Sequence, residues 1–569
     1  MLAEERSCFR CQLTAGWGDD FLIGVRARPE QAWAVEEFFE LFKTPWEFFR
    51  SDHVYDVVIV TSNDVPRIDK GLLLLYQADS LEWDDRLGVA RTERRATGNL
   101  KRGRETLPIY SGLLSFRVAL DSAVWAEGAD GGAAATTFTD SPLKVVRFGY
   151  NLFDEVQYLL TRGQPIENAS VPVLDLHVRM LRECVLEAGI SLVEIPPVPA
   201  KHGFAICLTH DIDFIGIRRH VFDHSMWGFV YRATVGSIRR LLEKRLTVGQ
   251  LLRNWAAVAF LPLVYMGLLR DFWEPFEWYL NVEKGLPSTY FLIPIKRHPG
   301  NRVPGSRAWR RASGYDVTDM PEAAKSLLKH SCEIGVHGID AWNSVEKGKF
   351  EAERIAKTTG KTPEGIRMHW LLSDQETTSK LEDAGFAYDS TVGYNETIGY
   401  RAGTNQVFRP IGSKRLLELP MLIQDGALFY PQRLNLTDQE ASQACNRIID
   451  HATQNGGIVT LLWHDRSHGP ERFWGSFYAR LIESLKKSDA WFGTCTEVSE
   501  WYRIRRGVKF ESVTTNCGRR VRMHSTMGTN DHGMRIRIHR KDCTSSHAGE
   551  MQEYTDMCWD GRSEQDIEL

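Results

Sequence analysis

From residue 203 to residue 505, short apolar segments alternate with longer segments whose apolar residues recur every three or four positions. The short segments have the length of strands, and the longer ones have the spacing of amphipathic helices. This alternation predicts βα units around a parallel sheet, and six or seven units over about 300 residues predict a closed or nearly closed barrel. The predicted strands are Phe204–Thr209, Ser288–Ile293, Glu333–His337, Gly365–Met368, Leu416–Pro420 and Gly457–Trp463. The predicted helices are Val345–Thr359, Asp374–Ala384, Thr437–Asn455 and Phe473–Lys487.

One connection in this region is far longer than a βα unit requires. The insertion Ile215–Leu286 is rich in Trp, Leu and Arg, and it contains the basic amphipathic stretch SIRRLLEKRL. It also contains an uncharged apolar stretch of 16 residues, Asn254–Leu269, which is shorter than the roughly 20 residues that span a bilayer. We expect a buried helix there. The alternative for this stretch is a helix that lies on a membrane surface. For the insertion as a whole we expect solvated helical faces packed on a core, and the alternative is a lid or a membrane-surface dock.

Residues 1–195 mix strand-like and helix-like patterns, which predicts a separate α/β accessory domain. Val54–Asp64 is predicted to be a buried strand, and Gln31–Phe42 and Asn151–Arg162 are predicted to be helices. The charged segment Leu81–Glu105 and the small, polar segment Ala126–Asp140 are predicted to be surface loops.

A Pro-rich linker, Glu194–Gly203, leads into the barrel region, residues 203–505. In the tail, residues 506–569, the stretches VKFESV, RRVRMHS and MRIRIHR alternate apolar and polar positions and predict strands of a small β appendage. The polar final segment, residues 545–569, is expected to be loose.

Composition excludes several classes of protein. The 569 residues are 43% hydrophobic and 25% charged, which is typical of a globular chain and not of a disordered one. The formal net charge of −4 gives no indication of nucleic-acid binding. Ten cysteines are too few for a disulfide scaffold, and Cys8 and Cys11 have no second metal-ligating pair nearby. The start, MLAEERSCFRCQL, lacks the apolar core of a signal peptide, so we expect a cytoplasmic protein.

Acidic and imidazole side chains recur where four predicted strands end. Asp211 and Asp213 follow the first strand, two positions apart, and therefore point to one face. His337 ends another strand. The remaining strand-end groups are Arg367, His369, His464 and Asp465. Because barrel active sites form at the carboxyl ends of the strands, we expect these groups on one rim. A cation held by carboxylate and imidazole would acidify a water molecule and polarise a carbonyl group. An Asp would accept the proton of this water, and a His would protonate a leaving amine.

The order of these motifs, THDID, STYFLI, EIGVHG, GIRMHW, YDST and LLWHD, resembles that of the NodB-type polysaccharide deacetylases, carbohydrate esterase family 4, in a THDxD variant. The resemblance extends from Phe204 to Tyr502. It implies a distorted (β/α)7 barrel that removes N-acetyl groups from GlcNAc-type saccharides with zinc or a similar divalent ion. It also implies a role for each matching residue: Asp211 as base, Asp213 and His337 as metal ligands, Arg367 as the residue that orients the base, and His464 as acid.

The sequence departs from this family at the metal. The family has a second His four residues after the first, and here Ala341 occupies that position. His369 is the favoured replacement and Asp340 is the second choice, while a weak or absent metal site is the third possibility. His210 alternates with Asp211 and Asp213, so it is expected to point into the barrel wall and has no assigned role.

The substrate contacts are less defined. Arg401, Asp425 and Trp463 follow or end the motif strands and are candidates for lining a sugar cleft. Two other functions stay open: an inactive carbohydrate-binding protein on the same barrel, and a hydrolase of another non-peptide C–N bond. The expected partners are a carbohydrate substrate and, through residues 215–286, a membrane surface.

Overall fold

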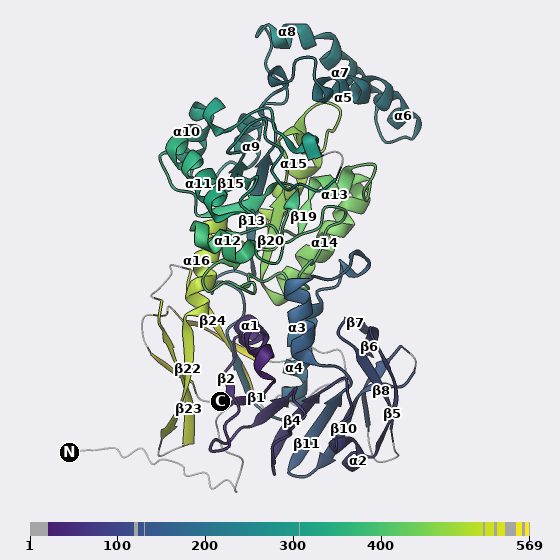
Figure 1. The fold of residues 1–569 in the computed structure, drawn as a ribbon, viewed down its shortest axis with the longest axis vertical. Helices are drawn as coiled ribbons and strands as arrows, with labels where there is room; N and C mark the ends of the chain where they lie inside the picture. The colour runs from purple at the N-terminus through teal and green to yellow at the C-terminus, as the bar shows by residue number, and fades with distance from the viewer. Residues whose placement is uncertain are drawn as a thin grey trace, which may run out of the picture.

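The computed structural model describes residues 21–118, 123–129, 131–305, 308–515, 518–527, 532–540, 554–559, 561 and 564–567. The Cys8 and Cys11 pair lies outside these residues. In Figure 1 a barrel-like α/β unit lies above an N-terminal sheet drawn in purple and blue and a C-terminal β appendage drawn in yellow-green. The chain is therefore of mixed α/β class.

A curled sheet of nine parallel strands positions the candidate site. Its order is β18-β17-β16-β15-β14-β13-β20-β19, and β21 also pairs with β13. The strands are β13 (Phe204–Ile212), β14 (Thr289–Leu292), β15 (Glu333–Gly338), β16 (Gly365–Met368), β17 (Tyr388–Asp389), β18 (Leu417–Glu418), β19 (Ile423–Gln424), β20 (Ile458–Leu462) and β21 (Ala490–Phe492). Among the described residues no pairing joins β18 to β19, so the barrel is open there.

The six predicted strands of this sheet correspond to β13, β14, β15, β16, β18 and β20, with ends that differ by a few residues. The pattern missed β17, β19 and β21, which are two or three residues long. Segments that short carry no periodicity, and they become strands only because longer neighbours offer them backbone partners.

Helices cover the outer face of this sheet (Figure 1). The predicted helices appear as α11 (Val345–Thr359), α12 (Thr377–Ala384), α14 (Asp438–Asn455) and α15 (Gly475–Leu485), joined by α10 (Pro321–Lys329) and α16 (Cys495–Arg506). Local sequence fixes their ends. Thr437 caps α14 together with Glu440, and Gly360 ends α11 in a left-handed conformation.

The N-terminal sheet has a parallel half, β2-β1-β3-β4-β11, continued by antiparallel strands. The parallel strands are β1 (Ile23–Arg26), β2 (Trp46–Phe48), β3 (Val57–Val60), β4 (Gly71–Tyr76) and β11 (Leu143–Phe148). The helices α1 (Ala32–Phe42), α3 (Leu152–Thr161) and α4 (Val173–Glu187) pack against them, with the short α2 (Trp83–Arg86) at the far edge. The predicted strand at residues 54–64 and the helices at 31–42 and 151–162 correspond to β3, α1 and α3.

The two predicted loops of this region are wrong. Residues 81–105 contain α2 and strands, and residues 126–140 contain strands. These antiparallel strands are β5 (Val89–Arg95), β6 (Gly98–Arg102), β7 (Glu105–Ile109), β8 (Leu113–Val118), β9 (Ala123–Gly128) and β10 (Ala133–Asp140). In the β6–β7 hairpin Leu100 is the one buried residue of β6, whereas the last three residues of β7 are buried in succession, so β6 and β7 do not show the sustained apolar alternation that predicts a strand. β10 buries small alanines between β9 and β11 instead of the large residues typical of strands.

The C-terminal appendage consists of two small antiparallel sheets. β22 (Val508–Thr515), β23 (Gly518–Ser525) and β24 (Met534–His539) are the three predicted strands. The expectation of a loose end is wrong for β25 (Tyr554–Trp559) and β26 (Gln565–Ile567), which pair with β24 and β23. β24 also pairs with β12 (Leu192–Glu194), which ties the appendage to the N-terminal region.

The long insertion is helical. It contains α5 (His224–Tyr231), a π-helical turn (Arg232–Gly236), α6 (Ser237–Leu242), α7 (Val248–Ala259), α8 (Leu261–Tyr265) and α9 (Phe276–Val282). The expectation of a buried helix at residues 254–269 is wrong. That stretch breaks at Phe260 into two short helices, and the side chains of Trp255, Phe260, Met266 and Leu268 are 43–69% exposed. Among the described residues, no helix combines the length and the apolar character that crossing a bilayer requires.

Candidate metal centre and active site

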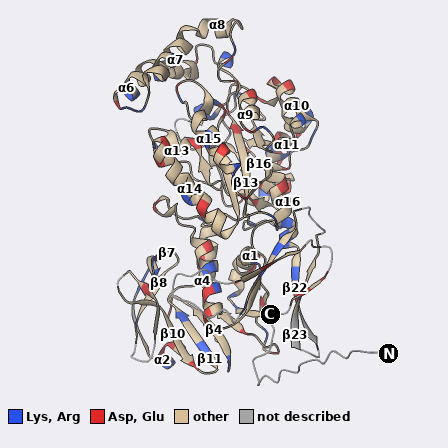
Figure 2. Cartoon of the chain, turned by 180° about the vertical axis from the view of Figure 1, so that it is seen from behind, with Lys and Arg blue, Asp and Glu red and all other residues tan. Residues whose placement is uncertain are grey.

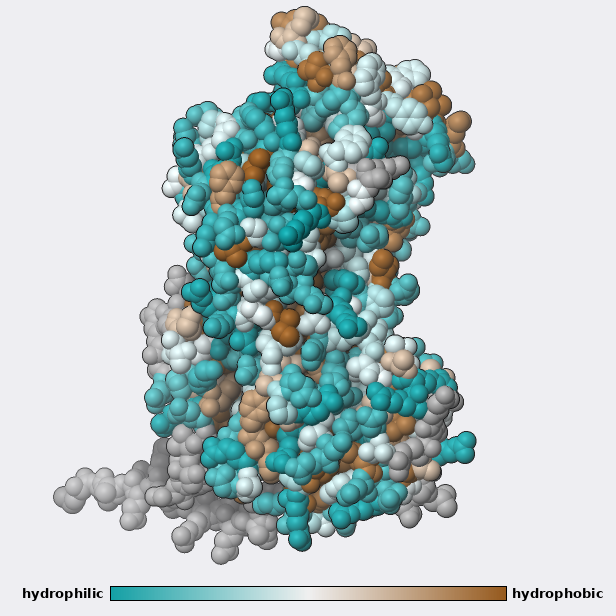
Figure 3. Space-filling view, in the orientation of Figure 1, coloured by the Kyte–Doolittle hydropathy of each residue, from teal (hydrophilic) through white to brown (hydrophobic). Residues whose placement is uncertain are grey.

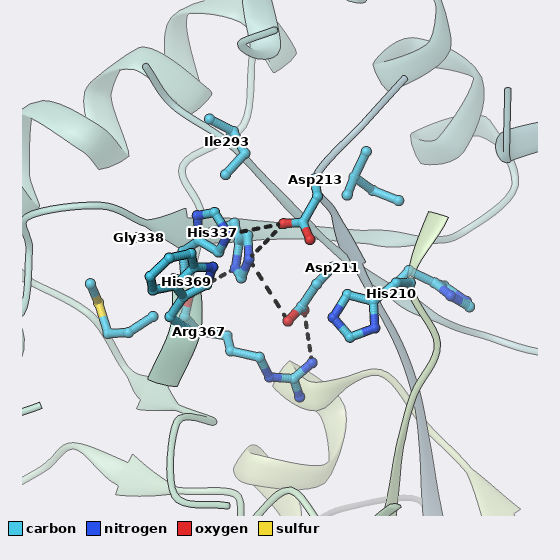
Figure 4. Close-up of polar contacts among 12 residues, drawn as sticks. His210, Asp211, Asp213, Ile293, His337, Gly338, Arg367 and His369 are labelled. Carbon is cyan, nitrogen blue, oxygen red and sulfur yellow. Dashed lines mark hydrogen bonds and ion pairs between the residues drawn. The ribbon is translucent and has the colours of Figure 1, made fainter. Parts of the chain in front are cut away.

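The first barrel strand supplies both aspartates of the site. Asp211 is the last residue but one of β13, and Asp213 follows the end of the strand. Because alternate residues of a strand share a face, both side chains lie on one side of β13 at the carboxyl ends of the strands (Figure 4). The Asp211 side chain is 4% exposed and that of Asp213 is 23% exposed, so Asp213 lies nearer to solvent.

His210 lies on the opposite face of β13 and takes no part in the site. Its Nε2 atom lies 2.8 Å from Glu283 Oε1, and its ring packs between those of Tyr279 and Tyr290. This placement agrees with the expectation that His210 points into the barrel wall.

Asp213 lies beside two imidazoles. His337 lies near the end of β15, and His369 follows β16 directly. Asp213 Oδ1 is 3.5 Å from His337 Nε2 and 3.3 Å from His369 Nε2. One possible ligand atom from each of the three residues lies within 4.8 Å of the others (Figure 4). The three side chains form a compact group that could hold a metal ion.

The donors of this group fit a divalent cation. Asp213 Oδ1 and His369 Nδ1 are buried and have no hydrogen-bond partner among the described residues. His337 Nδ1 lies 3.0 Å from the carbonyl oxygen of Arg367, so Nδ1 carries the proton and Nε2 keeps its lone pair toward the group. One carboxylate and two imidazoles match catalytic zinc sites, in which three protein ligands leave a position open.

The electrostatics of the group agree with this chemistry. Burial lowers the pKa of His369 well below its usual range, which keeps the imidazole neutral, as a ligand must be. Burial alone would raise the pKa of Asp213, but the imidazoles of His369 and His337 lower it overall, so the carboxylate is ionised.

The other candidate ligand, Asp340, points away from this group. Its Oδ2 atom lies 3.0 Å from His298 Nε2, and its Oδ1 atom accepts a hydrogen bond from the backbone N–H of Asn301 at 2.8 Å. Ala341, at the position of the family's second His, is fully buried. The structure therefore brings His369, and not Asp340, to Asp213 and His337.

A buried arginine that the sequence did not indicate holds the backbone beside both histidines. The Arg311 guanidinium donates to the carbonyl oxygen of His369 at 2.9 and 3.1 Å, and to those of Gly338 and Ile339 at 3.1 and 2.9 Å. Burial lowers the pKa of Arg311 to about 10, so it stays charged at neutral pH. Arg311 thus fixes the backbone on either side of the metal group.

Asp211 is held by an arginine of β16, a strand that β14 and β15 separate from β13 in the sheet. Arg367 Nη1 donates to Asp211 Oδ1 at 3.0 Å, and Arg367 Nε donates to the carbonyl oxygen of Ser390 at 2.9 Å. The Arg367 guanidinium also stacks on Phe291, 4.5 Å from the ring centroid. Asp211 Oδ2 lies 3.9 Å from His337 Nε2. One carboxylate oxygen is therefore anchored, and the other lies beside the metal group (Figure 4).

His464 lies past the end of β20, on the same rim, and pairs with a buried carboxylate. Its Nδ1 atom is 2.6 Å from Asp425 Oδ1, and its backbone N–H donates to Asp425 Oδ2 at 2.9 Å. Ser467 Oγ donates to the same carboxylate. Burial alone would lower the pKa of His464, but the Asp425 charge raises it to about 10. His464 is therefore a cation at neutral pH, and no described residue accepts a hydrogen bond from its Nε2–H.

A single pocket joins these groups. It is lined by Asp211, Asp213, His337, His369 and His464, and by Trp370, Leu371, Asn395, Gln424, Tyr430, Arg433, Leu462, Asp465, Arg466 and Arg472. Trp370 and Leu371 adopt left-handed backbone conformations, with φ of 65° and 55°, which are strained for such large residues. The Trp370 side chain is 40% exposed, so its ring is open to a ligand.

Sequence reasoning missed Arg433, Arg466 and Arg472. They come from loops after β19 and β20, where no periodic pattern marks them. Arg472 Nη2 donates to Tyr430 Oη at 2.5 Å, and Arg466 stacks on Phe214 and Trp273.

Asp465, which the sequence placed on the rim without a role, accepts a hydrogen bond from the backbone N–H of Asp213 at 3.1 Å. Burial raises the pKa of Asp465 to about 7.

The three proposed sugar-contacting residues lie elsewhere. Asp425 is fully buried behind His464. Trp463 is also fully buried and packs against Phe477 and Tyr478. Arg401 donates to backbone carbonyl oxygens of the N-terminal region at 2.6 and 2.8 Å. None of the three lines the pocket that contains the aspartates and histidines.

The sequence matches no protein-family model, and no curated protein matches it. Among solved structures it is similar to a carbohydrate deacetylase, Agd3, with 10% identity over 96% of this chain and 99% of that chain, and a TM-score of 0.38. A protein described as a polysaccharide deacetylase from Mycobacterium smegmatis matches 55% of this chain and 95% of its own, with 19% identity and a TM-score of 0.32. Puue allantoinase matches 54% and 94% of the two chains, with 14% identity and a TM-score of 0.33. All three TM-scores are below 0.5.

Proposed function

We propose that the chain is a divalent-metal-dependent hydrolase that removes N-acetyl groups from a saccharide. The observation that carries the proposal is the convergence of Asp213, His337 and His369 within 4.8 Å of one another. An anchored carboxylate, Asp211, and a cationic imidazole, His464, line the same pocket. Cation ligands, a base and an acid in one pocket are the groups that amide hydrolysis requires.

Asp213, His337 and His369 would hold the cation, and zinc suits this mixed set of oxygen and nitrogen donors. When bound, such a cation supplies Lewis acidity, which polarises a carbonyl group and makes water a stronger nucleophile. The remaining ionisable groups of the pocket would then handle the protons.

Asp211 would act as the base. Arg367 holds its Oδ1 atom at 3.0 Å, which leaves Oδ2 to accept a proton from the attacking water. The water oxygen forms a bond to the acetyl carbonyl carbon as this proton moves to Asp211. The arginine keeps the carboxylate correctly turned before the attack.

His464 would act as the acid. Its Nδ1 atom is bound to Asp425, so the proton on Nε2 is the one available to the departing nitrogen. Breaking the C–N bond with transfer of this proton releases acetate and a free amine. Asp425 is thus a positioning residue that keeps His464 protonated and oriented.

The choice of a saccharide rests on the motif resemblance and is supported by the lining of the pocket. The exposed ring of Trp370 offers a flat face of the kind that packs against sugar rings. Arg433, Arg466 and Arg472 offer hydrogen-bond donors to hydroxyl or acidic groups of a glycan. These residues take the substrate-binding role that the sequence had assigned to Arg401, Asp425 and Trp463.

The test is acetate release from N-acetylated glucosamine oligomers by the purified chain, first stripped of metal and then supplied with zinc. We expect release that depends on added metal and that is lost in Asp211→Asn. Lys361→Glu, on the exposed outer surface, serves as the matched control. Undiminished release by Asp211→Asn would refute the assigned base. Stoichiometric zinc without release from any saccharide, but with cleavage of a cyclic ureide or formamide, would favour a different C–N hydrolase. The absence of both metal and activity would favour a binding protein.

A further inference from the structure

Residues 221–270, here called the arm, project beyond the barrel at the top of Figure 1. The arm comprises α5, the π-helical turn, α6, α7 and α8. It exposes 14 of the 26 large hydrophobic side chains that are exposed among the described residues, although it is only a small part of the chain. Brown, apolar residues gather over this region in Figure 3. A concentration of this kind marks a contact surface, whereas scattered single residues do not.

The exposed apolar residues form helical stripes. On α7, Val248, Leu252 and Trp255 are 43–61% exposed and lie on one face, because they are four and three positions apart. Leu251 and Asn254, on the neighbouring face of α7, are buried against the rest of the arm and the barrel rim. A helix that faced only water would present polar residues where these three lie.

A second stripe runs through the π-helical turn and α6. Val235, Ile238 and Leu242 are three and four positions apart and are 45–78% exposed. Phe260, Met266 and Leu268 extend the apolar surface at the other end of the arm, with exposures of 52–69%. Both stripes lie on short helices. The longer helix, α7, has 12 residues and is about 18 Å long, which is too short to cross a hydrocarbon core of about 30 Å.

The arm is strongly basic. Residues 221–270 contain seven Lys and Arg and two Asp and Glu, in a chain whose net charge is −4. The side chains of Arg239, Lys244, Arg245 and Arg253 are exposed beside the apolar stripes, and α6 can be followed in Figure 2 by its blue residues. Neither Lys244 nor Arg253 has an ion pair among the described residues. Basic and apolar side chains on one surface, with Trp and Tyr among them, match the chemistry of an anionic bilayer surface.

Polar contacts hold the arm to the barrel. Arg232 Nε lies 2.6 Å from Glu471 Oε2, and Arg240 Nη1 donates to the carbonyl oxygen of Glu471 at 2.6 Å. Asn254 Oδ1 accepts a hydrogen bond from the backbone N–H of Glu471 at 2.6 Å. One loop of the barrel rim thus contacts the π-helical turn, α6 and α7, which carry both stripes.

We propose that the arm docks the protein on an anionic phospholipid membrane, with its helices lying in the plane of the interface. A bilayer suits the arm better than a second copy of the chain does. Two copies that met through this face would bring their excess of basic residues together, which is unfavourable. The docking does not depend on the proposed reaction.

The test is flotation of the full chain with vesicles of phosphatidylcholine alone and with vesicles containing 30% phosphatidylglycerol. We expect strong binding to the anionic vesicles at 0.1 M salt, weak binding to the neutral ones, and a marked loss of binding at 0.5 M salt. Leu252→Ser combined with Trp255→Ser should reduce binding at least tenfold, and Lys244→Glu combined with Arg253→Glu should do the same.

Two matched controls share the exposure of these positions but lie outside the arm: Ile411→Ser and Lys361→Glu. Both should bind vesicles as the unaltered chain does, and circular dichroism should show that every variant is folded. The absence of binding to anionic vesicles, or equal losses in arm and control variants, would overturn the proposal. So would a dimer in sedimentation experiments that Leu252→Ser combined with Trp255→Ser converts to a monomer, because the arm would then be a contact between copies.

Discussion

His464 Nδ1 lies 2.6 Å from Asp425 Oδ1, although the two residues are 39 positions apart in the chain. The Asp425 carboxylate is fully buried and also accepts the backbone N–H of His464 at 2.9 Å. This relationship fixes the orientation of the imidazole and raises its pKa to about 10, against the effect of burial. It assigns Asp425 a role that its position in the sequence did not suggest.

The first prediction concerns Asp425→Asn. Removal of the negative charge lowers the pKa of His464, so the alkaline limb of the kcat profile should move to lower pH and kcat at pH 8 should fall by roughly 100-fold. The measurement is kcat from pH 6 to 10 with zinc-loaded enzyme. In Asp425→Glu, which keeps the charge, the alkaline limb of the kcat profile should stay close to its original pH. An unshifted limb in Asp425→Asn would show that Asp425 does not set the protonation of His464.

The second prediction separates the two candidates for the third ligand. His369→Gln should weaken zinc binding by more than about 100-fold, because it removes one of three converging donors. Asp340→Asn should have a much smaller effect, because Asp340 is engaged by His298 and Asn301. Zinc affinity is measured by competition with a chelating dye at pH 7.5. The reverse order of the two effects would reinstate Asp340 as the ligand.

The third prediction concerns Arg311, which touches no substrate. The lysine of Arg311→Lys cannot reach all the carbonyl oxygens that the guanidinium now contacts, so the backbone beside His337 and His369 should loosen. We expect zinc affinity to fall by roughly 10- to 100-fold. The exposed neighbour Arg310 provides the control, and Arg310→Lys should bind zinc normally. Equal affinities for the two variants would rule out a positioning role for Arg311.

The fourth prediction concerns the pH dependence of stability. Glu194 is buried between Arg182 and His539; burial would raise its pKa, but these partners lower it to about 2. A carboxyl group whose folded-state pKa lies below its unfolded value stabilises the fold above about pH 4.5, and this contribution is lost as the pH falls toward 2. The contribution is at most about 3 kcal/mol.

Glu194→Gln should therefore unfold at a lower temperature than the unaltered chain at pH 7, and the difference should shrink between pH 5 and pH 3. Thermal unfolding followed by circular dichroism measures both chains. A difference in Tm that stays constant over this range would show that the charge of Glu194 contributes nothing.

The residues of the site that could be predicted from the sequence are those at the ends of regular strands. Asp211, Asp213, His337 and Arg367 end or follow long apolar segments, and parallel strands deliver such ends to one rim. As the third metal ligand, His369 could be ranked above Asp340 only by its position. It lies two residues after Arg367, so Arg367 and His369 share one strand end.

Other parts of the site depend on contacts that no local pattern encodes. Arg311 binds backbone carbonyl oxygens, which every residue provides, so its neighbours in the sequence give no signal. Asp425 follows β19, a strand of two residues that forms only against β20. The apolar stretch at 254–269 suggested burial, but hydrophobicity alone does not distinguish a core helix from an exposed contact face.

The central claim is that Asp213, His337 and His369 bind one cation. The most direct measurement is X-ray diffraction from zinc-loaded crystals at the zinc absorption edge, with anomalous difference maps. The account predicts one strong peak per chain between Asp213 Oδ1 and the two imidazoles. A peak at any other residues, or none at a zinc concentration that supports activity, would contradict it.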